Sequence, residues 1–563
     1  MNSSKILINF ENYKDINSFN ENIKTIKFDF FKRFTFDTKF DFDHFYSLLN
    51  KISLLKSYDL YIGFYCVKFS KERLINLIDF IISNKSIKDN LKRFKIASEV
   101  INNELLKILT DKLLKECINL QSFKIRTINQ KNIIDGMCYL TNYINNTNIT
   151  SFSICESYIN KTLMNSIINL IDNNKLTKLR ISYCSFEDTI EEFNILSKSL
   201  INNTSLQKLC LPNNNLDKSI IDIISCLKQR YEKNQDEKID KDYDKDYDKD
   251  YDKNYDKDYI KDYIKDYDKD YIKDYDKDYI KDYDINQNKN HIINQINKSF
   301  SNKYFEYLDL SSNNIDNNIF KLICNDLFYI KKLDLSDNSN LTNIEPIYDL
   351  IINNKHLTYL KLSNVNVEDF NPLINALKIN KTITHLDVNT NHFNFKSLTN
   401  LYDLIKINKT ITNLNISNIY FSEYSKDYKQ IEFIKNICEA LKENNTITNI
   451  NLSYNNFDKE GFDAINNLIN YNSTLKCLNI GTVEKEYMTQ EQFNEFSKTL
   501  KYNTSLEFIN ISGCVNYKIN LDLLNDVLTL NNTIKIFGID KYIIYNLIDF
   551  NILKNKIQFK EFY

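Results

Sequence analysis

Polar residues at a fixed place in a repeated block are the part of this sequence best suited to bind a partner. Before residue 210 most of them are Lys or Arg, whose cations pair with carboxylates and phosphates. Beyond residue 300 they are mixed and then mostly Asn, whose amide both donates and accepts hydrogen bonds. The candidate partner-binding residues are Arg93, Lys95, Lys124, Arg126, Lys178, Arg180, Lys208, Tyr307, Asp309, Asp334, Tyr359, Lys361, His385, Asp387, Asn415, Asn451, Asn479 and Asn510.

The sequence lacks the combinations of residues that catalysis would need. His385 and His392 lie near Asp387, but no nucleophile or metal-ligand spacing accompanies them, and we interpret them as solvent-facing histidines. The chain contains no phosphate-binding, dinucleotide-binding, zinc-protease or serine-hydrolase motif, and its 6 Gly provide little material for phosphate-binding loops. We therefore expect no enzymatic activity, no cofactor and no metal.

The cysteines and the overall charge restrict the class of protein. Eleven Cys are scattered without a C-x-x-C pair, which is typical of reduced, mostly buried thiols in a cytoplasmic or nuclear protein. The net charge is −2 at pH 7, so no global field attracts nucleic acid or an acidic membrane. No apolar run approaches a membrane span, and the N-terminal apolar stretch is too short for a signal peptide. We expect a protein partner, with no nucleic acid and no membrane.

The block that carries the candidate residues has the form L-x-x-L-x-L. Clear copies begin at Leu357, Ile383, Ile411, Ile447 and Leu475, so successive starts lie 26, 28, 36 and 28 residues apart. This is the period of a solenoid with one strand and one helix per unit. Because side chains alternate along a strand, the aliphatic residues point into the core and the residues between them point to the open face. The candidate residues occupy those open-face positions.

Further copies on both sides of the clear ones predict sixteen strands in all. Between strands, apolar residues such as Leu373, Ala376 and Leu377 have helical spacing, which predicts one helix per unit. Each helix is expected to end in an Asn turn, as at Asn444 and Asn531, because Asn tolerates the left-handed conformation that stops a helix. The additional strands begin at Ile23, Leu55, Leu91, Leu120, Ile149, Leu176, Leu206, Phe305, Ile330, Leu506 and Ile534.

This consensus resembles the leucine-rich repeat family, and the unit length with a full helix resembles its ribonuclease-inhibitor-like class. In that family an Asn or Cys three residues after the final strand Leu bonds the backbone of the turn. The resemblance covers about residues 120–540 and implies an α/β horseshoe solenoid, with parallel strands on the concave face and helices on the convex face. The matching residues are Asn214, Asn313, Asn338, Asn391, Asn455, Cys184 and Cys514, whereas Ser157, Val365, Ile419 and Val483 depart.

The repeats are interrupted once, by Lys-Asp-Tyr tetrads. Residues 241–284 hold eleven of them, with 11 Lys and 17 Asp, so this tract carries −6 and leaves +4 for the rest of the chain. Such a composition buries nothing, and we expect a disordered or marginally helical loop. The tract either has no role or folds back over the basic residues as an internal competitor. The predicted organisation is an N-terminal cap at 1–22, repeats at 23–230, the low-complexity insertion at 231–300, repeats at 301–540 and a C-terminal cap at 541–563.

These features favour a non-enzymatic scaffold that binds an acidic or phosphorylated protein on the concave face, in the cytoplasm or nucleus. Two alternatives stay open. Ran GTPase-activating proteins are similar in repeat class, which would imply a regulator of a small GTPase, although their acidic C-terminal tail is missing here. A substrate adaptor of a ubiquitin ligase would need a helical F-box before the repeats, whereas the alternation in Phe28-Asp29-Phe30 suits strands better.

Overall fold

The computed structural model divides into two compact units, one of residues 1–228 and 305–563 and the other of residues 229–304. None of the helices that the structure describes is long and apolar enough to cross a membrane. The described residues are 4–8, 23–31, 42–54, 58–65, 71–97, 101–127, 130–186, 190–216, 219–246, 305–421, 426–455, 457–482, 487–515 and 522–539.

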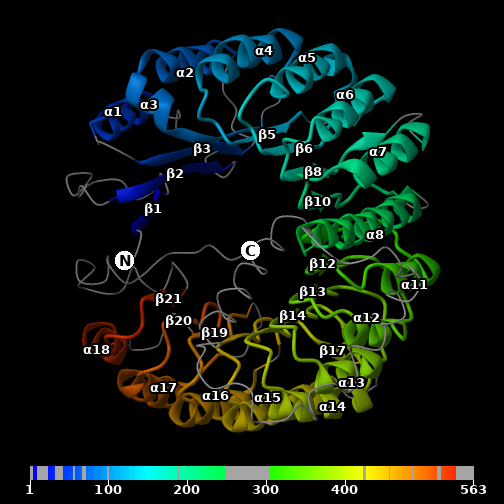
Figure 1. Ribbon diagram of the computed structural model, residues 1–563. Coiled ribbons are helices and arrows are strands. Elements are labelled where there is room, and N and C mark those ends of the chain that lie inside the picture. The colour runs from blue at the N-terminus through cyan, green and yellow to red at the C-terminus, as the bar shows by residue number, and fades with distance from the viewer. Residues whose placement is uncertain are drawn as a thin grey trace, which may run out of the picture. The chain divides into compact units, whose positions relative to one another are not determined.

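The first unit is built on one parallel sheet of 17 described strands, in which each strand pairs with the strand of the next repeat. Its order along the sheet follows the chain (Figure 1). The strands are β1 (Ser4–Ile8), β2 (Ile23–Phe31), β3 (Asp59–Tyr65), β4 (Leu91–Ala97), β5 (Ser122–Arg126), β6 (Ser151–Cys155), β8 (Lys178–Ser182), β10 (Lys208–Cys210), β11 (Tyr307–Asp309), β12 (Lys332–Asp334), β13 (Tyr359–Lys361), β14 (His385–Asp387), β16 (Asn413–Asn415), β18 (Asn449–Asn451), β19 (Cys477–Asn479), β20 (Phe508–Asn510) and β21 (Ile536–Gly538).

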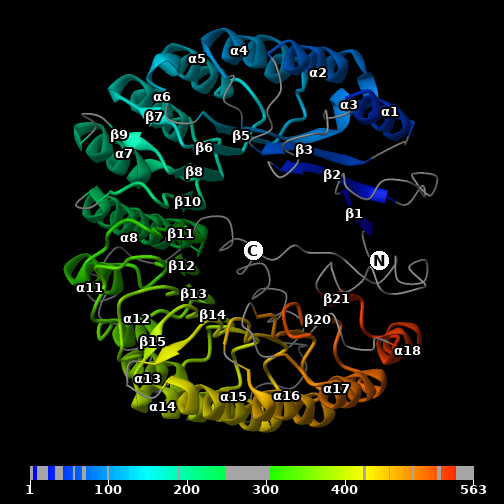
Figure 2. The ribbon, with the colours of Figure 1, turned by 180° about the vertical axis from the view of Figure 1, so that it is seen from behind.

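Helices cover one face of this sheet, and they lie side by side in chain order (Figures 1 and 2). We call the opposite face, which no described helix covers, the strand face. The helices of the first unit are α1 (Phe42–Ile52), α2 (Lys71–Ser83), α3 (Lys85–Asn90), α4 (Asn103–Ile108) with a π-helical turn at Leu109–Leu114, α5 (Ile134–Ile144), α6 (Lys161–Asp172), α7 (Ile190–Asn202), α11 (Asn317–Asp326), α12 (Ile347–Asn353), α13 (Asn371–Ile379), α14 (Phe395–Ile407), α15 (Lys426–Glu443), α16 (Lys459–Tyr471), α17 (Gln490–Tyr502) and α18 (Asp522–Leu530).

The aliphatic block accounts for this arrangement. Leu357, Leu360 and Leu362 are fully buried between sheet and helices, while Tyr359 and Lys361 lie on the strand face. The helical residues predicted to face the sheet, such as Leu377, are also buried. Burial of apolar surface between neighbouring repeats is the main source of stability in such a solenoid. The α/β solenoid predicted from the repeats is therefore confirmed.

Aromatic residues replace leucine in the core of the first repeats. Phe94, Phe123 and Phe152 occupy the same position on successive strands, Phe64 lies two residues further along β3, and all four are fully buried. Their ring centroids lie 6.3, 6.3 and 6.4 Å apart along the series, within the range of favourable ring contacts. These rings extend the core across repeats whose aliphatic consensus is weak.

A buried Asn in the turn after each of several strands ties that repeat to the one before it. The Oδ1 of Asn338 accepts the backbone N–H groups of Asn313 at 2.9 Å and Ile315 at 3.0 Å. Its Nδ2 donates to the carbonyls of Leu310 at 3.2 Å and Leu335 at 2.8 Å. These are the backbone bonds that the resemblance implied. The other turn asparagines with side-chain bonds of this kind are Asn214, Asn313, Asn391 and Asn455.

The sequence predicted a left-handed backbone for the asparagines at the helix ends, and this prediction was wrong. Neither Asn444 nor Asn531 has a positive φ. Asn444 instead accepts the N–H groups of Thr446 and Ile447, each at 2.8 Å, and donates to the carbonyl of Ile405 at 2.6 Å. Its side chain thus starts the next strand. The left-handed residues mostly follow the strands: Glu156, Tyr183, Asn213, Asn215, Ser312, Asn314, Asp337, Asn364, Thr390, Asn418, Tyr454 and Gly513, with Asn174 at a helix end.

Some elements were not predicted. The segment expected to be only a cap contains β1, which pairs in parallel with β2. Short strands outside the main sheet form two further parallel pairs, β7 (Tyr158–Ile159) with β9 (Ser185–Phe186) and β15 (His392–Phe393) with β17 (Tyr420–Phe421). The third strand begins at Asp59 rather than Leu55, and residues 55–57 lie outside the described part.

The insertion falls between two neighbouring strands, because β10 pairs directly with β11. Helix α8 (Ser219–Asp246) continues past Lys228, where the first unit ends, and includes the first residues of the Lys-Asp-Tyr tract. The rest of the tract, like the predicted C-terminal cap, lies outside the described residues, and what we expect of them stays a prediction.

Candidate functional site

From β8 to β20 the strand face presents its residues in two rows that run across the strands. Neighbouring strands pair in register, so the side chain at a given strand position in one repeat lies directly beside the side chain at the same position in the next repeat. The first row is Lys178, Lys208, Tyr307, Lys332, Tyr359, His385, Asn413, Asn449, Cys477 and Phe508. The second row is Arg180, Cys210, Asp309, Asp334, Lys361, Asp387, Asn415, Asn451, Asn479 and Asn510.

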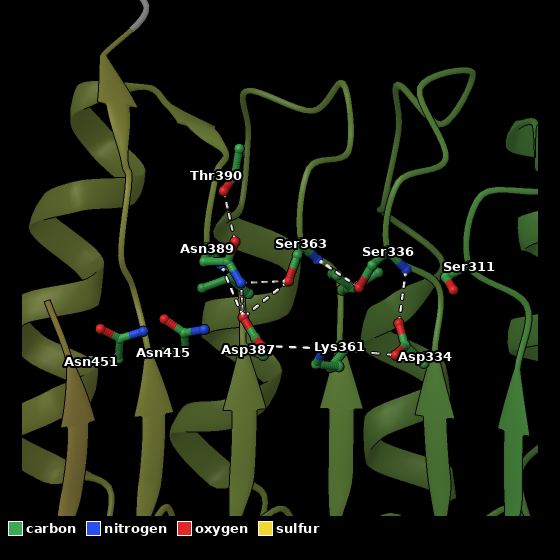
Figure 3. Close-up of polar contacts among 12 residues, drawn as sticks. Ser311, Asp334, Ser336, Lys361, Ser363, Asp387, Asn389, Thr390, Asn415 and Asn451 are labelled. Atoms are coloured by element: carbon green, nitrogen blue, oxygen red, sulfur yellow. Dashed lines mark hydrogen bonds and ion pairs between the residues drawn. The ribbon is translucent and has the colours of Figure 1, made fainter. Parts of the chain in front are cut away.

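The middle of the second row is a closed charge network. Lys361 Nζ lies 3.8 Å from Asp334 Oδ2 and 3.6 Å from Asp387 Oδ2, so one cation bridges the two neighbouring strands (Figure 3). Burial disfavours the ammonium charge of Lys361, but the two carboxylates outweigh it and raise its pKa. Burial also raises the pKa of Asp334, against the attraction of Lys361. The charge of Lys361 is thus already paired within the chain and is not free to attract a partner.

Short polar residues at the strand ends hold this network in place. Ser363 Oγ donates to Asp387 Oδ1 at 3.0 Å, and Asn389 Nδ2 donates to Asp387 Oδ1 at 2.6 Å and to Ser363 Oγ at 2.9 Å (Figure 3). The N–H of Ser336 donates to Asp334 Oδ1 at 3.1 Å. Sequence reasoning missed these supporting residues. Their signal is a Ser directly after the last aliphatic residue of the block, which recurs at Ser311, Ser336, Ser363, Ser417, Ser453 and Ser512.

Several cations of the predicted basic surface are paired within the chain. Arg180 Nη1 lies 3.1 Å from Asp309 Oδ2, and Arg126 Nη2 lies 2.5 Å from Glu156 Oε1. Lys208 Nζ lies 3.1 Å from Glu306 Oε2. The remaining basic candidates on the strand face are Lys124 and Lys178, which have no carboxylate partner among the described residues, Lys95, and Arg93, whose guanidinium lies 4.7 Å from the ring centre of Tyr61.

Three candidates are too buried to meet a partner, so the prediction that they lie exposed was wrong. Asp309, Asp334 and Asn510 are 4%, 7% and 2% exposed. Asp309 Oδ1 accepts both the N–H and the Oγ of Ser311, at 3.2 and 2.7 Å, which turns the carboxylate toward its own strand end. Cys210, at the matching position of β10, is also buried. Position within the block therefore does not by itself ensure exposure.

The amide part of the two rows surrounds a hollow of about 300 Å³. It lies over strands β13, β14, β16, β18, β19 and β20, and we call it the amide hollow. Aromatic and imidazole rings lie on strands at its two ends, and half of the lining residues between them are asparagines. The lining residues are Tyr359, His385, Leu386, Asp387, Asn413, Leu414, Asn415, Asn449, Ile450, Asn451, Cys477, Asn479 and Phe508.

The asparagines of the second row alternate in how they use their amides. The Oδ1 of Asn415 accepts the N–H and Oγ of Ser417, at 3.2 and 2.8 Å, and the Oδ1 of Asn479 accepts the Nδ2 of Asn510 at 2.8 Å. Asn451 donates its Nδ2 to Ser417 Oγ at 3.4 Å. Within the described part of the chain, the Nδ2 groups of Asn415 and Asn479 donate to no acceptor. Both amides lie on the lining of the hollow.

The two histidines do not meet as a reactive pair. His385 Nδ1 lies 2.8 Å from Thr384 Oγ1, and burial lowers the pKa of His385. His392 stacks on Tyr420, with ring centres 5.1 Å apart, on the separate pair of short strands. The described residues contain no group of three or more His, Cys, Asp or Glu that could hold a metal ion.

The fold and the two rows define a repeat solenoid of the α/β class with one open strand face. No family model matches the chain, and no curated protein matches it either. Among solved structures the chain is similar to the crystal structure of the Rad7 and Elc1 complex in yeast. That match has 13% sequence identity and a TM-score of 0.37, and it covers 81% of this chain and 87% of the other.

Proposed function

We propose that this chain is a leucine-rich repeat protein of the ribonuclease-inhibitor-like class that binds a protein partner on its strand face and catalyses no reaction of its own. Its unit lengths, 25 to 36 residues apart from the unit that holds the insertion, and the single helix between most neighbouring strands support that class. The turn asparagines, which bond backbone groups of the neighbouring repeat, support it as well.

The observation that carries the proposal is the amide hollow. Most of its lining side chains are half-buried and uncharged. The Nδ2 groups of Asn415 and Asn479 donate no hydrogen bond within the described residues. Covering uncharged amides costs less solvation energy than covering charged side chains, and the amides offer directed hydrogen bonds to a partner. The charge network beside it, around Lys361, is already satisfied and would position the rim of the site.

Part of the partner is proposed to be acidic or phosphorylated and to lie over the basic end of the strand face. Lys124 and Lys178 are the cations that support this contact, because neither has a carboxylate partner in the described residues. Replacing both with Glu should weaken capture of the partner and reduce its dependence on salt. Arg126 and Arg180 are left unchanged in this test because their ion pairs belong to the fold.

The proposal is tested by affinity capture from lysate of cells that express the protein, followed by mass spectrometry. Asn413→Lys with Asn449→Lys places two long side chains in the hollow without touching the core. Asn467→Lys with Asn470→Lys makes the same changes on exposed positions of α16, on the opposite face. We expect specific partners to be lost with the first pair and kept with the second. Equal capture by all three proteins would contradict the proposal.

A further inference from the structure

In the second row of the amide hollow, the Nδ2 groups that donate to no acceptor among the described residues lie on alternate strands. Asn415 is on β16 and Asn479 on β19, with β18 between them. In the second row of the hollow, Asn451 uses its Nδ2 on Ser417 and Asn510 uses its Nδ2 on Asn479. What this row offers to a partner is therefore a pair of N–H donors separated by two strand spacings, or about 9.6 Å.

That separation matches one kind of peptide. A polyproline II helix rises about 3.1 Å per residue with three residues per turn, so equivalent carbonyls recur every 9.3 Å or so along one side. Its backbone makes no internal hydrogen bonds, and proline has no N–H, so a proline-rich segment offers acceptors and no donors. An extended β-strand repeats on one side about every 6.8 Å and does not match this pair.

The ends of the hollow fit the same ligand. Tyr359 and His385 lie on neighbouring strands at one end, with ring centres 6.0 Å apart, and Phe508 lies at the other. Aromatic side chains that flank a groove are the usual contact surface for proline rings. The asparagines between them are uncharged, which suits a segment whose backbone accepts hydrogen bonds and whose side chains carry no charge.

We propose that the amide hollow binds a proline-rich segment in the polyproline II conformation, lying across the strands with its carbonyls on Asn415 and Asn479. This assignment rests on the proposed function and names the partner segment for that site. Five strand spacings separate β13 from β20, or about 24 Å, which about eight residues of this helix would span.

The test is fluorescence anisotropy of the full chain with a labelled oligoproline of about ten residues. We expect saturable binding, weakened about tenfold by each of Asn415→Asp and Asn479→Asp, because a carboxylate of the same shape cannot donate. Asn467→Asp makes the same change on the exposed side of α16 and should bind as well as the unchanged protein. The oligoproline should also slow alkylation of Cys477, which lines the hollow, and leave Cys138 unaffected.

Other results would overturn the assignment. They are failure of the oligoproline to bind, binding that both Asp variants leave unchanged, and equal or tighter binding of a Gly-Ser peptide or a neutral oligosaccharide of the same length. If the oligoproline fails while Asn413→Lys with Asn449→Lys still abolishes capture of the cellular partner, the peptide class is wrong and the proposed function stands. If capture is also unaffected, both are wrong.

Discussion

Arg180 on β8 reaches past β10 to Asp309 on β11, where its Nη1 lies 3.1 Å from the carboxylate Oδ2, although the two residues are 129 positions apart in the chain. The ion pair links β8, the last but one strand before the insertion, to β11, the first strand after it. Burial opposes the guanidinium charge, but Asp309 together with the nearby Cys210 and Cys155 outweighs that effect and raises the pKa of Arg180. The two parts of the repeat array are thus joined by side chains as well as by the backbone pairing of β10 and β11.

Removing the Arg180 side chain should destabilise the array. Arg180→Met leaves the buried Asp309 carboxylate without its cation, so we expect the free energy of unfolding in urea to fall by about 2–3 kcal/mol. The double variant Arg180→Met with Asp309→Leu should recover most of that loss, because no buried charge then remains. A single variant as stable as the unchanged protein would show that the pair contributes nothing to the join.

Replacing the turn asparagine Asn338 should lower the free energy of unfolding of the repeat array. Its amide bonds backbone groups of two repeats, and Asn338→Asp keeps the shape but loses the donors to Leu310 and Leu335. We expect a loss of about 2–4 kcal/mol in chemical denaturation, because buried carbonyls are left unpaired beside a buried acid. Asn340→Asp is the matched change at an exposed position of the same turn and should shift stability by less than about 0.5 kcal/mol.

Deleting residues 241–284 should leave the repeat array folded. Neither β10 nor β11 loses a strand partner, and shortening a long connection changes its closure entropy by only about 0.5 kcal/mol. We expect an unchanged circular dichroism spectrum and a melting temperature within a few degrees of that of the full chain. Higher affinity for the cellular partner at low salt after this deletion would support the tract as an internal competitor, whereas unchanged affinity would count against it.

Thiol reactivity should separate the cysteines by burial. Among the ten described, Cys138 and Cys477 are partly exposed and the other eight are buried. Burial raises the pKa of Cys117 to about 12 and raises the pKa of Cys477 above its usual 9.0. We expect maleimide to label Cys138 and Cys477 slowly in the native protein, and faster as pH rises, because the thiolate reacts. If peptide mapping finds Cys117 labelled as fast as Cys138 and Cys477, the buried position of Cys117 between a helix and β5 is contradicted.

The repeat spacing predicted the fold because burial of the aliphatic block depends on local pattern alone. All sixteen predicted strands are present, within a few residues of the predicted starts. The strand β1 was missed because Ser4–Ile8 lacks the block that defines the other repeats. The backbone of Asn444 was misjudged because its amide bonds the following strand, a contact that depends on the neighbouring repeat.

The candidate site was predicted only in part. Alternation along the strands placed Tyr359, Lys361 and Asn415 on the strand face, where they lie. It did not predict that Asp309 would be bonded by Ser311 and buried, or that Asn415 and Asn479 would keep spare donors. These details follow from which side chain of a neighbouring strand lies within bonding distance, and a single repeat does not contain that information.

We predict that a protein partner binds in the amide hollow, and site-specific crosslinking is the sharpest test of this prediction. Benzophenone maleimide would be attached to Cys477 in a chain with Cys66 and Cys138 changed to Ser, and, for comparison, to Asn467→Cys on α16 in the same chain with Cys477→Ser. After irradiation in cell lysate, we predict discrete protein adducts from position 477 and none from position 467. Adducts from position 467 alone, or from neither position, would contradict the claim.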